Sequence, residues 1–308
     1  MAISAKDVSE LRAKTGVGMM DCKKALEDTN GNFDEAIKLL REKGLAVAAK
    51  KAARITAEGA VDILYDEATK TAAMIEVNIE TDFAAKADSF RAFVKGCLEV
   101  IQKENPADVE ELLTKPFGNG QSVDDMLKEN IQQIGENITI RRFVTVVGEL
   151  STYVHNKGAI GVIVKVEPDE AALSDPGFPE FKKNLALQVA SMNPLYVDKA
   201  EVPDSVIQEE KEIIANQIKN DEDNAKKPAN VIEKMVEGKI RKYFEDNCLL
   251  QQGYVKEDKI SVGEYVENYK KQSGASVKVE AFHRFEKGEG IQKREDNFAE
   301  EIAQLTQK

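Results

Sequence analysis

The first fifty residues carry apolar side chains at the spacing of three short amphipathic helices. Ser4 and Asp7 have the capping-box spacing that predicts a helix start, and Gly16 allows the loop that ends this helix. Two further helices are predicted by two apolar stripes: Met19, Cys22, Ala25 and Leu26, then Phe33, Ala36, Ile37 and Leu40. Gly44 is placed to cap the third helix. The pattern predicts a compact helical bundle with its linker over residues 1–54.

From about Gly59 the apolar period changes from helical to alternating, which is typical of strands. The expected elements are strands over 60–65 and 72–79, helices over 88–103 and 126–134, and one long strand over 138–150 that Tyr153 and Val154 continue. The strands at 60–65 and 72–79 are expected to pair antiparallel. We expect an α+β subdomain over residues 55–150.

The second half of the chain repeats this order weakly. The expected elements are a strand over 159–166, a helix over 179–189, long helices over 202–219 and 228–249, a strand over 275–284 and a polar helix over 295–305. We expect a second, related α+β subdomain over residues 151–286, with a projecting helical hairpin at about 202–249 and Pro228 at the first position of its second helix. Residues 287–308 are expected to form a C-terminal helical module.

Charge and composition narrow the function classes. The chain of 308 residues has a net charge of −12, so its overall field repels nucleic acid and anionic lipid. The small basic island at 46–54 is interpreted as a solvated helix that links two modules. Cys22, Cys97 and Cys248 form no CxxC pattern, which is typical of reduced thiols. With no export signal and no stretch of about 20 apolar residues, we expect a cytoplasmic protein away from membranes.

The residues typical of catalysis are sparse. His155 and His283 are the only histidines, and neither lies near a Cys, Ser or Asp pattern that marks nucleophilic catalysis or metal binding. The glycines near Gly118 and Gly288 lack the strand, Lys and Ser/Thr context of a phosphate loop. We therefore expect no enzyme activity, no metal and no cofactor.

Five segments resemble, in order, the bacterial-type translation elongation factor Ts family. They are LRAKTGVGMMDCKKAL (11–26), VNIETDFAAK (77–86), IGENITIRR (134–142), EKMVEGKIRKYF (233–244) and RFEKGEGIQK (284–293). The resemblance implies a ubiquitin-associated-like bundle, two related core subdomains, a helical hairpin and a C-terminal module. It also implies guanine-nucleotide exchange on GDP-bound elongation factor Tu.

The resemblance assigns displacement of the partner's magnesium ion to Thr81, Asp82, Phe83 and Ala84. Ala84 departs mildly from the valine common in the family, and the change stays small and apolar. An exposed aromatic could wedge between partner helices while the carboxylate competes near the metal. The alternative is that Asp82 only caps a turn and Phe83 packs in the core.

Four further residues are implied as partner contacts by the same resemblance. Arg12, Met19 and Met20 are expected to touch a helix of the partner, which suits the adaptable methionine side chain. The alternative for all three is a place in the core of the bundle, above all for Met19, which lies on the stripe of Cys22 and Leu26. His155, expected in a loop between two strands, is assigned to another domain of the partner, with a purely structural histidine as the alternative.

Two other function classes stay open at this point. One is an adaptor that uses the bundle to bind helices and the rest of the chain as a dimerisation platform. Residues 81–84 would have no role in such an adaptor. The other is a hydrolase, which would need clustered carboxylates that the sequence does not indicate. A homodimer through the hairpin or a core sheet is not decided by the sequence.

Overall fold

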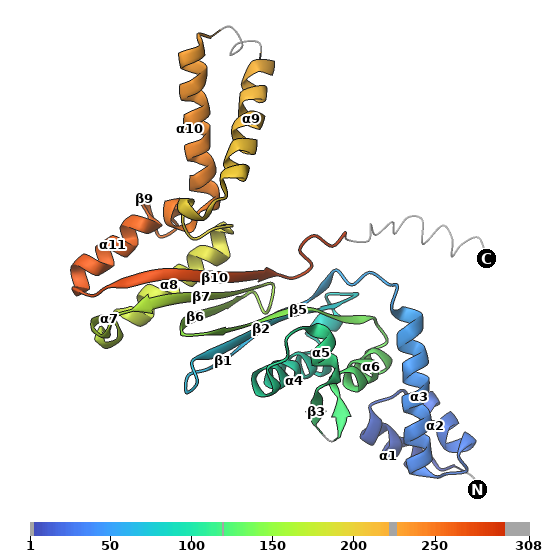
Figure 1. Cartoon of the computed structure of the whole chain (residues 1–308). Helices are drawn as coiled ribbons and strands as arrows, with labels where there is room; N and C mark the ends of the chain where they lie inside the picture. The colour runs from blue at the N-terminus through green and yellow to red at the C-terminus, as the bar shows by residue number, and fades with distance from the viewer. Residues whose placement is uncertain (1–2, 119, 222–226, 293–308) are drawn as a thin grey trace.

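The computed structural model of the chain describes residues 3–118, 120–221 and 227–292. Figure 1 shows a helical bundle at the N-terminal end, a body of two stacked sheets with helices outside them, and a helical hairpin that projects from the other end. The predicted α+β class is confirmed. The helix expected over 295–305 lies outside the described residues, and the domain boundaries at 54, 150 and 286 stay predictions.

Three helices form the N-terminal bundle as predicted: α1 (Ala5–Thr15), α2 (Met19–Asp28) and α3 (Phe33–Lys51). The capping box at the start of α1 is confirmed. The Asp7 amide donates to Ser4 Oγ at 3.2 Å, and the Ser4 amide donates to the Asp7 carboxylate at 3.0 Å. The small core of the bundle consists of Val8, Leu11, Val17, Cys22, Ala25, Leu26, Ala36 and Leu40.

Gly44 does not end the third helix, so that prediction is wrong. α3 continues beyond Gly44, and a Cβ there would lie 2.5 Å from Gln132 Oε1 of α6 (Val123–Ile134). The glycine therefore gives two helices room to approach instead of a left-handed cap. Arg41 Nε pairs with Glu129 Oε1 of α6 at 3.2 Å. The bundle is thus docked on the body through α3 and α6.

The first sheet has the strand order β1-β2-β5, and both pairs are antiparallel. Its strands are β1 (Glu58–Asp66), β2 (Thr71–Ile79) and β5 (Ile138–Val147). The helices that share its core are α4 (Asp88–Glu104), α5 (Val109–Thr114) and α6. The sequence did not predict α5 or the small hairpin of β3 (Pro116–Gly118) and β4 (Gln121–Ser122).

The long strand expected over residues 138–150 is two strands in different sheets. β5 ends at Val147, and β6 (Glu149–His155) belongs to the second sheet. Gly148 lies between them with φ 137°, a backbone conformation that residues with a Cβ rarely adopt. Because both strands alternate in polarity, the pattern runs through the glycine and hides the change of sheet.

Gly148→Ala is expected to lower the free energy of unfolding by about 1–3 kcal/mol because of this backbone conformation. A Cβ at Gly148 would also lie 2.8 Å from Cε of Lys165. Urea unfolding followed by circular dichroism measures the change. The control is Gly238→Ala in the hairpin, where a Cβ meets nothing within 4 Å and where we expect no loss. A Gly148 variant as stable as the parent would contradict this account of the crossing.

The second sheet has the order β10-β7-β6 and is also antiparallel. It adds the strands β7 (Ile160–Pro168) and β10 (Val277–Glu286). The predicted helix at 179–189 is α8 (Phe178–Met192), which packs on β6 and β7. The elements that the sequence did not predict are α7 (Glu170–Ser174), β8 (Gly253–Tyr254), β9 (Glu257–Ser261) and α11 (Val262–Ser273).

The two sheets pack against each other through their inner faces (Figure 1). Met74 of β2 and Ile163 of β7 are fully buried in this contact. The Val61 amide of β1 donates to the carbonyl of Gly158 at 2.9 Å. The central strands β2 and β7 are therefore covered on both faces, which explains their nearly continuous apolar sequences.

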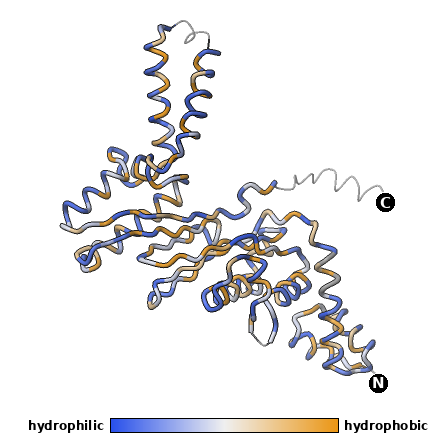
Figure 2. Tube along the Cα trace, in the orientation of Figure 1, coloured by the Kyte–Doolittle hydropathy of each residue, from blue (hydrophilic) through white to orange (hydrophobic). Residues whose placement is uncertain are grey.

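The predicted helical hairpin is confirmed as α9 (Asp204–Asn220) and α10 (Ala229–Asn247). Pro228 is the N-cap of α10 and not its first helical residue, a difference of one position. Figure 2 shows hydrophobic segments alternating with hydrophilic ones along both arms. The apolar seam between the helices contains the buried residues Ile214, Ile218 and Ile240.

Candidate functional site

Residues 80–86, directly after β2, form a short projecting segment that we call the tip. The Glu136 carboxylate accepts hydrogen bonds from the Thr81 amide at 2.9 Å and from the Thr81 hydroxyl at 2.7 Å. The Thr81 hydroxyl accepts from the Ala84 amide at 3.2 Å. This bond lies at the start of η1 (Ala84–Lys86), which is one turn of 3-10 helix. Thr81 thus anchors the tip to the body on one side and shapes its turn on the other.

Phe83 is the most exposed of the large apolar side chains that the structure describes, with 84% of its surface open. Its backbone is helical, with φ −68° and ψ −49°, and its carbonyl accepts from the Lys86 amide at 3.1 Å. The alternative in which Phe83 packs in the core is therefore wrong. Full burial of a phenylalanine against a partner is favourable by about 1.5–3 kcal/mol.

Asp82 lies beside Phe83 and is paired with Lys86, four residues along the chain. Lys86 Nζ lies 2.6 Å from Asp82 Oδ2, and this hydrogen bond holds the pKa of the carboxyl below its usual range. Both side chains are exposed, so the pair is screened by solvent and adds little stability. The carboxylate is ionised at neutral pH and can exchange its partner. Lys86 was not assigned from the sequence, although its spacing of four residues from Asp82 indicates such a pair.

Ala84, the fourth residue assigned to magnesium displacement, points inward. It is buried in the core cluster of the first sheet, next to Ala85. Its side chain therefore seats the tip on the body and does not face a partner. Thr81 and Asp82 are exposed, so the structure places Thr81, Asp82 and Phe83 on the outer side of the tip.

The residues assigned to the bundle surface are exposed. Met20 has 76% of its surface open and Met19 has 42%, and both lie in the first turn of α2. Arg12 is exposed on α1, which packs on α2. The alternative that Met19 belongs to the core of the bundle is wrong, because the buried core contains Cys22 and Leu26 but not Met19.

His155 is the last residue of β6 and not a loop residue as expected. Its side chain is exposed, and Nδ1 lies 2.8 Å from the hydroxyl of Tyr153. The two rings are tilted with centroids 5.9 Å apart. The structure thus places His155 in the second sheet, on a different element from the tip and from the bundle.

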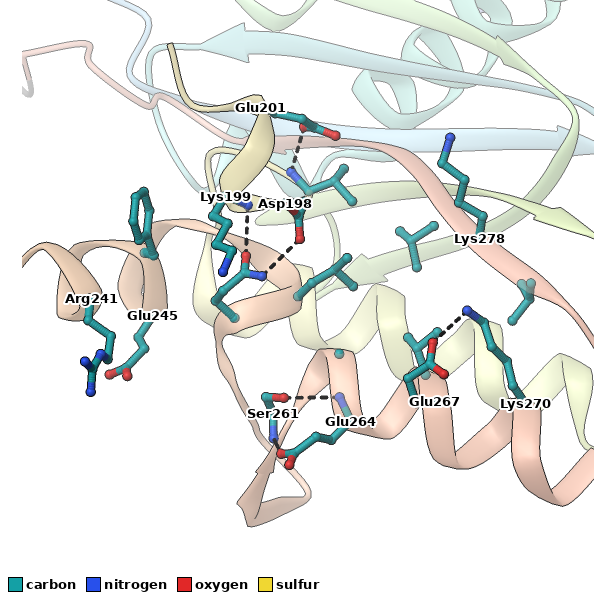
Figure 3. Close-up of a pocket in the computed structure, with 18 residues that line it drawn as sticks. Asp198, Lys199, Glu201, Arg241, Glu245, Ser261, Glu264, Glu267, Lys270 and Lys278 are labelled. Carbon is teal, nitrogen blue, oxygen red and sulfur yellow. Dashed lines mark hydrogen bonds and ion pairs between the residues drawn. The ribbon is translucent and has the colours of Figure 1, made fainter. Parts of the chain in front are cut away.

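A cavity of about 730 Å³ lies at the base of the hairpin, between η2 (Lys199–Glu201), α10, α11 and β10 (Figure 3). Several of its polar groups bind one another: Gln251 Nε2 donates to Asp198 Oδ2 at 3.0 Å, and Lys270 Nζ pairs with a Glu267 oxygen at 2.8 Å. Its lining contains no histidine or cysteine. Among the described residues, none of the carboxylates that line the cavity belongs to a group of three placed to hold a metal ion.

The thiols and carboxylates show no reactive grouping in the described part of the chain. All three cysteines are buried and free, and burial raises the pKa of Cys248 to about 11 and also raises the pKa of Cys97. Within the described ranges, no three His, Cys, Asp or Glu side chains are placed to hold a metal ion. Nor does any described helix have the length and apolarity required to span a membrane.

Comparison with known proteins shows the family of the chain. The family model described as "Elongation factor TS" matches residues 80–289. The protein named elongation factor Ts from Clostridium botulinum (strain Eklund 17B / Type B) is 43% identical over 304 residues, or 98% of each chain. The protein of the same name from a Nitratiruptor species is 44% identical over 307 residues, covering 98% of this chain and 99% of the relative. This chain belongs to the elongation factor Ts family.

Proposed function

We propose that this protein is a guanine-nucleotide exchange factor of translation elongation. It binds GDP-bound elongation factor Tu and accelerates the release of GDP without covalent chemistry, so it is not an enzyme and uses no cofactor. Family membership supports the partner and the process. The observation that carries the mechanism is the exposed Phe83 ring on a tip that Glu136 holds in place.

The tip acts on the partner's magnesium site. Magnesium requires near-octahedral oxygen ligands and bridges nucleotide phosphates to protein, so small displacements of its surroundings weaken GDP binding. Phe83 wedges into an apolar gap of the partner, where its burial is favourable. Asp82 leaves Lys86 and offers a competing carboxylate near the disturbed site, and Ala84 holds the tip on the body.

The bundle makes a second contact, separate from the tip. Met19 and Met20 present flexible apolar side chains beside Arg12, a combination that fits an irregular helix surface. His155 is proposed as a third contact, on the second sheet. Once one of the two contacts has formed, the other site is held close to the partner, so its effective concentration there is raised. Linkage then requires that returning nucleotide weaken the complex by the same coupling, which frees the factor for another cycle.

An adaptor would bind helices through the bundle, and the exposed Phe83 would have no role in it. This alternative includes dimerisation through the hairpin or a core sheet. The apolar seam of the hairpin is filled by its own two helices, which does not favour pairing with a second copy there. Exchange therefore accounts for more of the exposed features than the adaptor does.

Catalytic amounts of the protein are expected to accelerate the release of a fluorescent GDP analogue from elongation factor Tu. The coupling typical of linked sites corresponds to roughly 5–150-fold in affinity, and we expect at least this range in the release rate. Stopped-flow fluorescence with excess unlabelled GDP measures it. An adaptor would co-purify with the partner and leave the rate unchanged, and that result would reject the proposed function.

A further inference from the structure

The turn directly after α6, residues 135–137, binds the chain that leaves the N-terminal bundle. Lys51 Nζ, in the last turn of α3, donates to the first carbonyl of this turn. Asn137 Nδ2 donates to the carbonyls of Arg54 at 3.0 Å and Ala52 at 3.4 Å. Three hydrogen bonds thus fix the exit of the bundle to the body at one place.

The same turn also binds the tip. The Asn137 amide donates to Glu80 Oε1 at 2.6 Å, while Glu136 accepts from the amide and the hydroxyl of Thr81. The β2–β5 ladder ends just before these residues. The backbone amides of Thr81 and Asn137 therefore donate to the side-chain carboxylates of Glu136 and Glu80 instead of to backbone carbonyls. Glu80 Oε1 is also 3.4 Å from Arg54 Nη1, which ties the tip directly to the exit of the bundle.

The two side chains of the turn differ in their surroundings. Asn137 is 4% exposed, and the bonds described for its side-chain amide go only to the exit of the bundle, while its backbone amide binds Glu80. Glu136 is partly exposed, and the bonds described for its carboxylate go to the tip. The side chains of Asn137 and Glu136 therefore make separate bonds, one set to the exit of the bundle and one to the tip, beside the direct pair of Glu80 with Arg54.

We propose that residues 135–137 are a joint that sets the bundle and the tip in one fixed relation, with Asn137 positioning the bundle and Glu136 positioning Phe83. This inference rests on the proposed function. Neither residue is proposed to touch the partner. A tip held in its binding conformation loses less conformational entropy when it engages, and a bundle held at a fixed distance raises the effective concentration of the tip.

The two connections are expected to fail differently. Glu136→Ala frees Thr81 and lets the tip fluctuate, so we expect the maximal rate of GDP release to fall about tenfold, the factor that corresponds to fixing roughly one backbone residue. The KM for elongation factor Tu should change less than twofold, since the bundle is untouched. Glu136→Gln keeps an oxygen acceptor and should recover most of the rate. Hydrogen exchange should accelerate at the amides of residues 81–86 and not in α1 to α3.

Asn137→Ala releases the bundle exit. We expect the KM to rise about fivefold to tenfold through lost effective concentration, with the maximal rate within twofold of the parent. Spin labels at Lys24→Cys in α2 and Ala92→Cys in α4, both exposed positions, should show a broader distance distribution in this variant. The native cysteines are buried and do not compete for the label. If Asn137→Ala does not fold, Lys51→Met removes one bond to the same turn and should show the same effect more weakly.

The controls are Glu99→Ala and Asn268→Ala, two exposed positions on α4 and α11 that should leave both kinetic constants unchanged. The joint is rejected if Glu136→Ala and Asn137→Ala exchange GDP like the parent while Phe83→Ala does not. It is also rejected if both variants change the same kinetic constant, either the maximal rate or the KM, by the same factor. If the parent itself does not accelerate GDP release, the proposed function fails, and the hydrogen-exchange and spin-label results still decide whether the joint fixes the two parts.

Discussion

Phe83→Ala is expected to lower the maximal rate of GDP release from elongation factor Tu by about 30-fold or more, the factor that corresponds to losing a binding hot spot of roughly 2 kcal/mol. The ring is 84% exposed, so the free protein loses few contacts and its unfolding free energy should change by less than about 0.5 kcal/mol. In the proposed complex the ring fills an apolar gap of the partner, which alanine cannot fill. Stopped-flow release at saturating factor measures the rate, and urea unfolding measures the stability.

Leu173→Ala is the matched control for this experiment. Leu173 is another exposed apolar side chain, but it lies on α7 of the second subdomain, away from the tip. We expect this variant to exchange nucleotide like the parent. Adding Asp82→Ala to Phe83→Ala should slow release further. A parent-like rate for the double variant would refute the assignment of the tip.

Glu76→Ala is expected to lower the free energy of unfolding by about 3 kcal/mol, the lower end of the range for breaking a buried ion pair. Glu76 is fully buried on β2. Its carboxylate pairs with Arg141 Nη1 at 3.0 Å and Arg142 Nε at 2.7 Å, and it accepts from the Gly288 amide at 2.8 Å. Removal leaves two cations, the Gly288 amide and the buried side-chain amide of Asn78 without this partner. Both arginines are partly exposed, so water relieves some of the cost.

A β-bulge explains how two neighbouring arginines reach one carboxylate. Glu76 pairs with Arg142 in the ladder and the next pair is Val77 with Ile140, so Arg141 is an extra residue on β5. A bulge re-aims side chains that would otherwise point to opposite faces of the sheet. Both guanidinium groups can then lie on the side of Glu76, where they also hold the chain that leaves β10.

Urea unfolding followed by circular dichroism measures the loss at Glu76. The control is Glu99→Ala, whose carboxylate forms an exposed pair with Lys95 at 3.9 Å as its one described ion pair within residues 3–118, 120–221 and 227–292. We expect this control to lie within about 0.5 kcal/mol of the parent. A loss below about 1 kcal/mol for Glu76→Ala, the value of an ordinary neutral hydrogen bond, would mean that the cluster does not support the fold as proposed.

Local sequence signals predicted the elements whose ends are fixed by their own residues. Ser4 with Asp7 predicted the start of α1, and Gly16 was correctly identified as its end, where its φ is 66°. The errors came where a glycine serves a distant contact. Gly44 makes room for α6 and Gly148 passes the chain between sheets, and neither role is visible in the neighbouring sequence. Short elements such as α5 were missed because six residues are too few to show a period.

The candidate site shows the same difference between residues that could be assigned from the sequence and residues whose roles depend on distant contacts. Thr81, Asp82, Phe83 and Ala84 were assigned by family resemblance, and the structure shows that Phe83 is exposed while Ala84 is buried. Glu136 could not be assigned, because it lies 55 residues from Thr81 and nothing in its own segment indicates the bond. Roles that depend on folded geometry, such as those of Glu136 and Asn137, required the structure.

The tip is proposed to release GDP by disturbing the partner's magnesium. The direct test is the ratio of GDP release rates with the parent protein and with Phe83→Ala, measured in the presence of magnesium and again in excess chelator. We predict a ratio of about 30 with magnesium, as for a lost hot spot, and a ratio approaching one without it. An equally large ratio in both conditions would show that Phe83 acts on something other than the metal site and would contradict the mechanism.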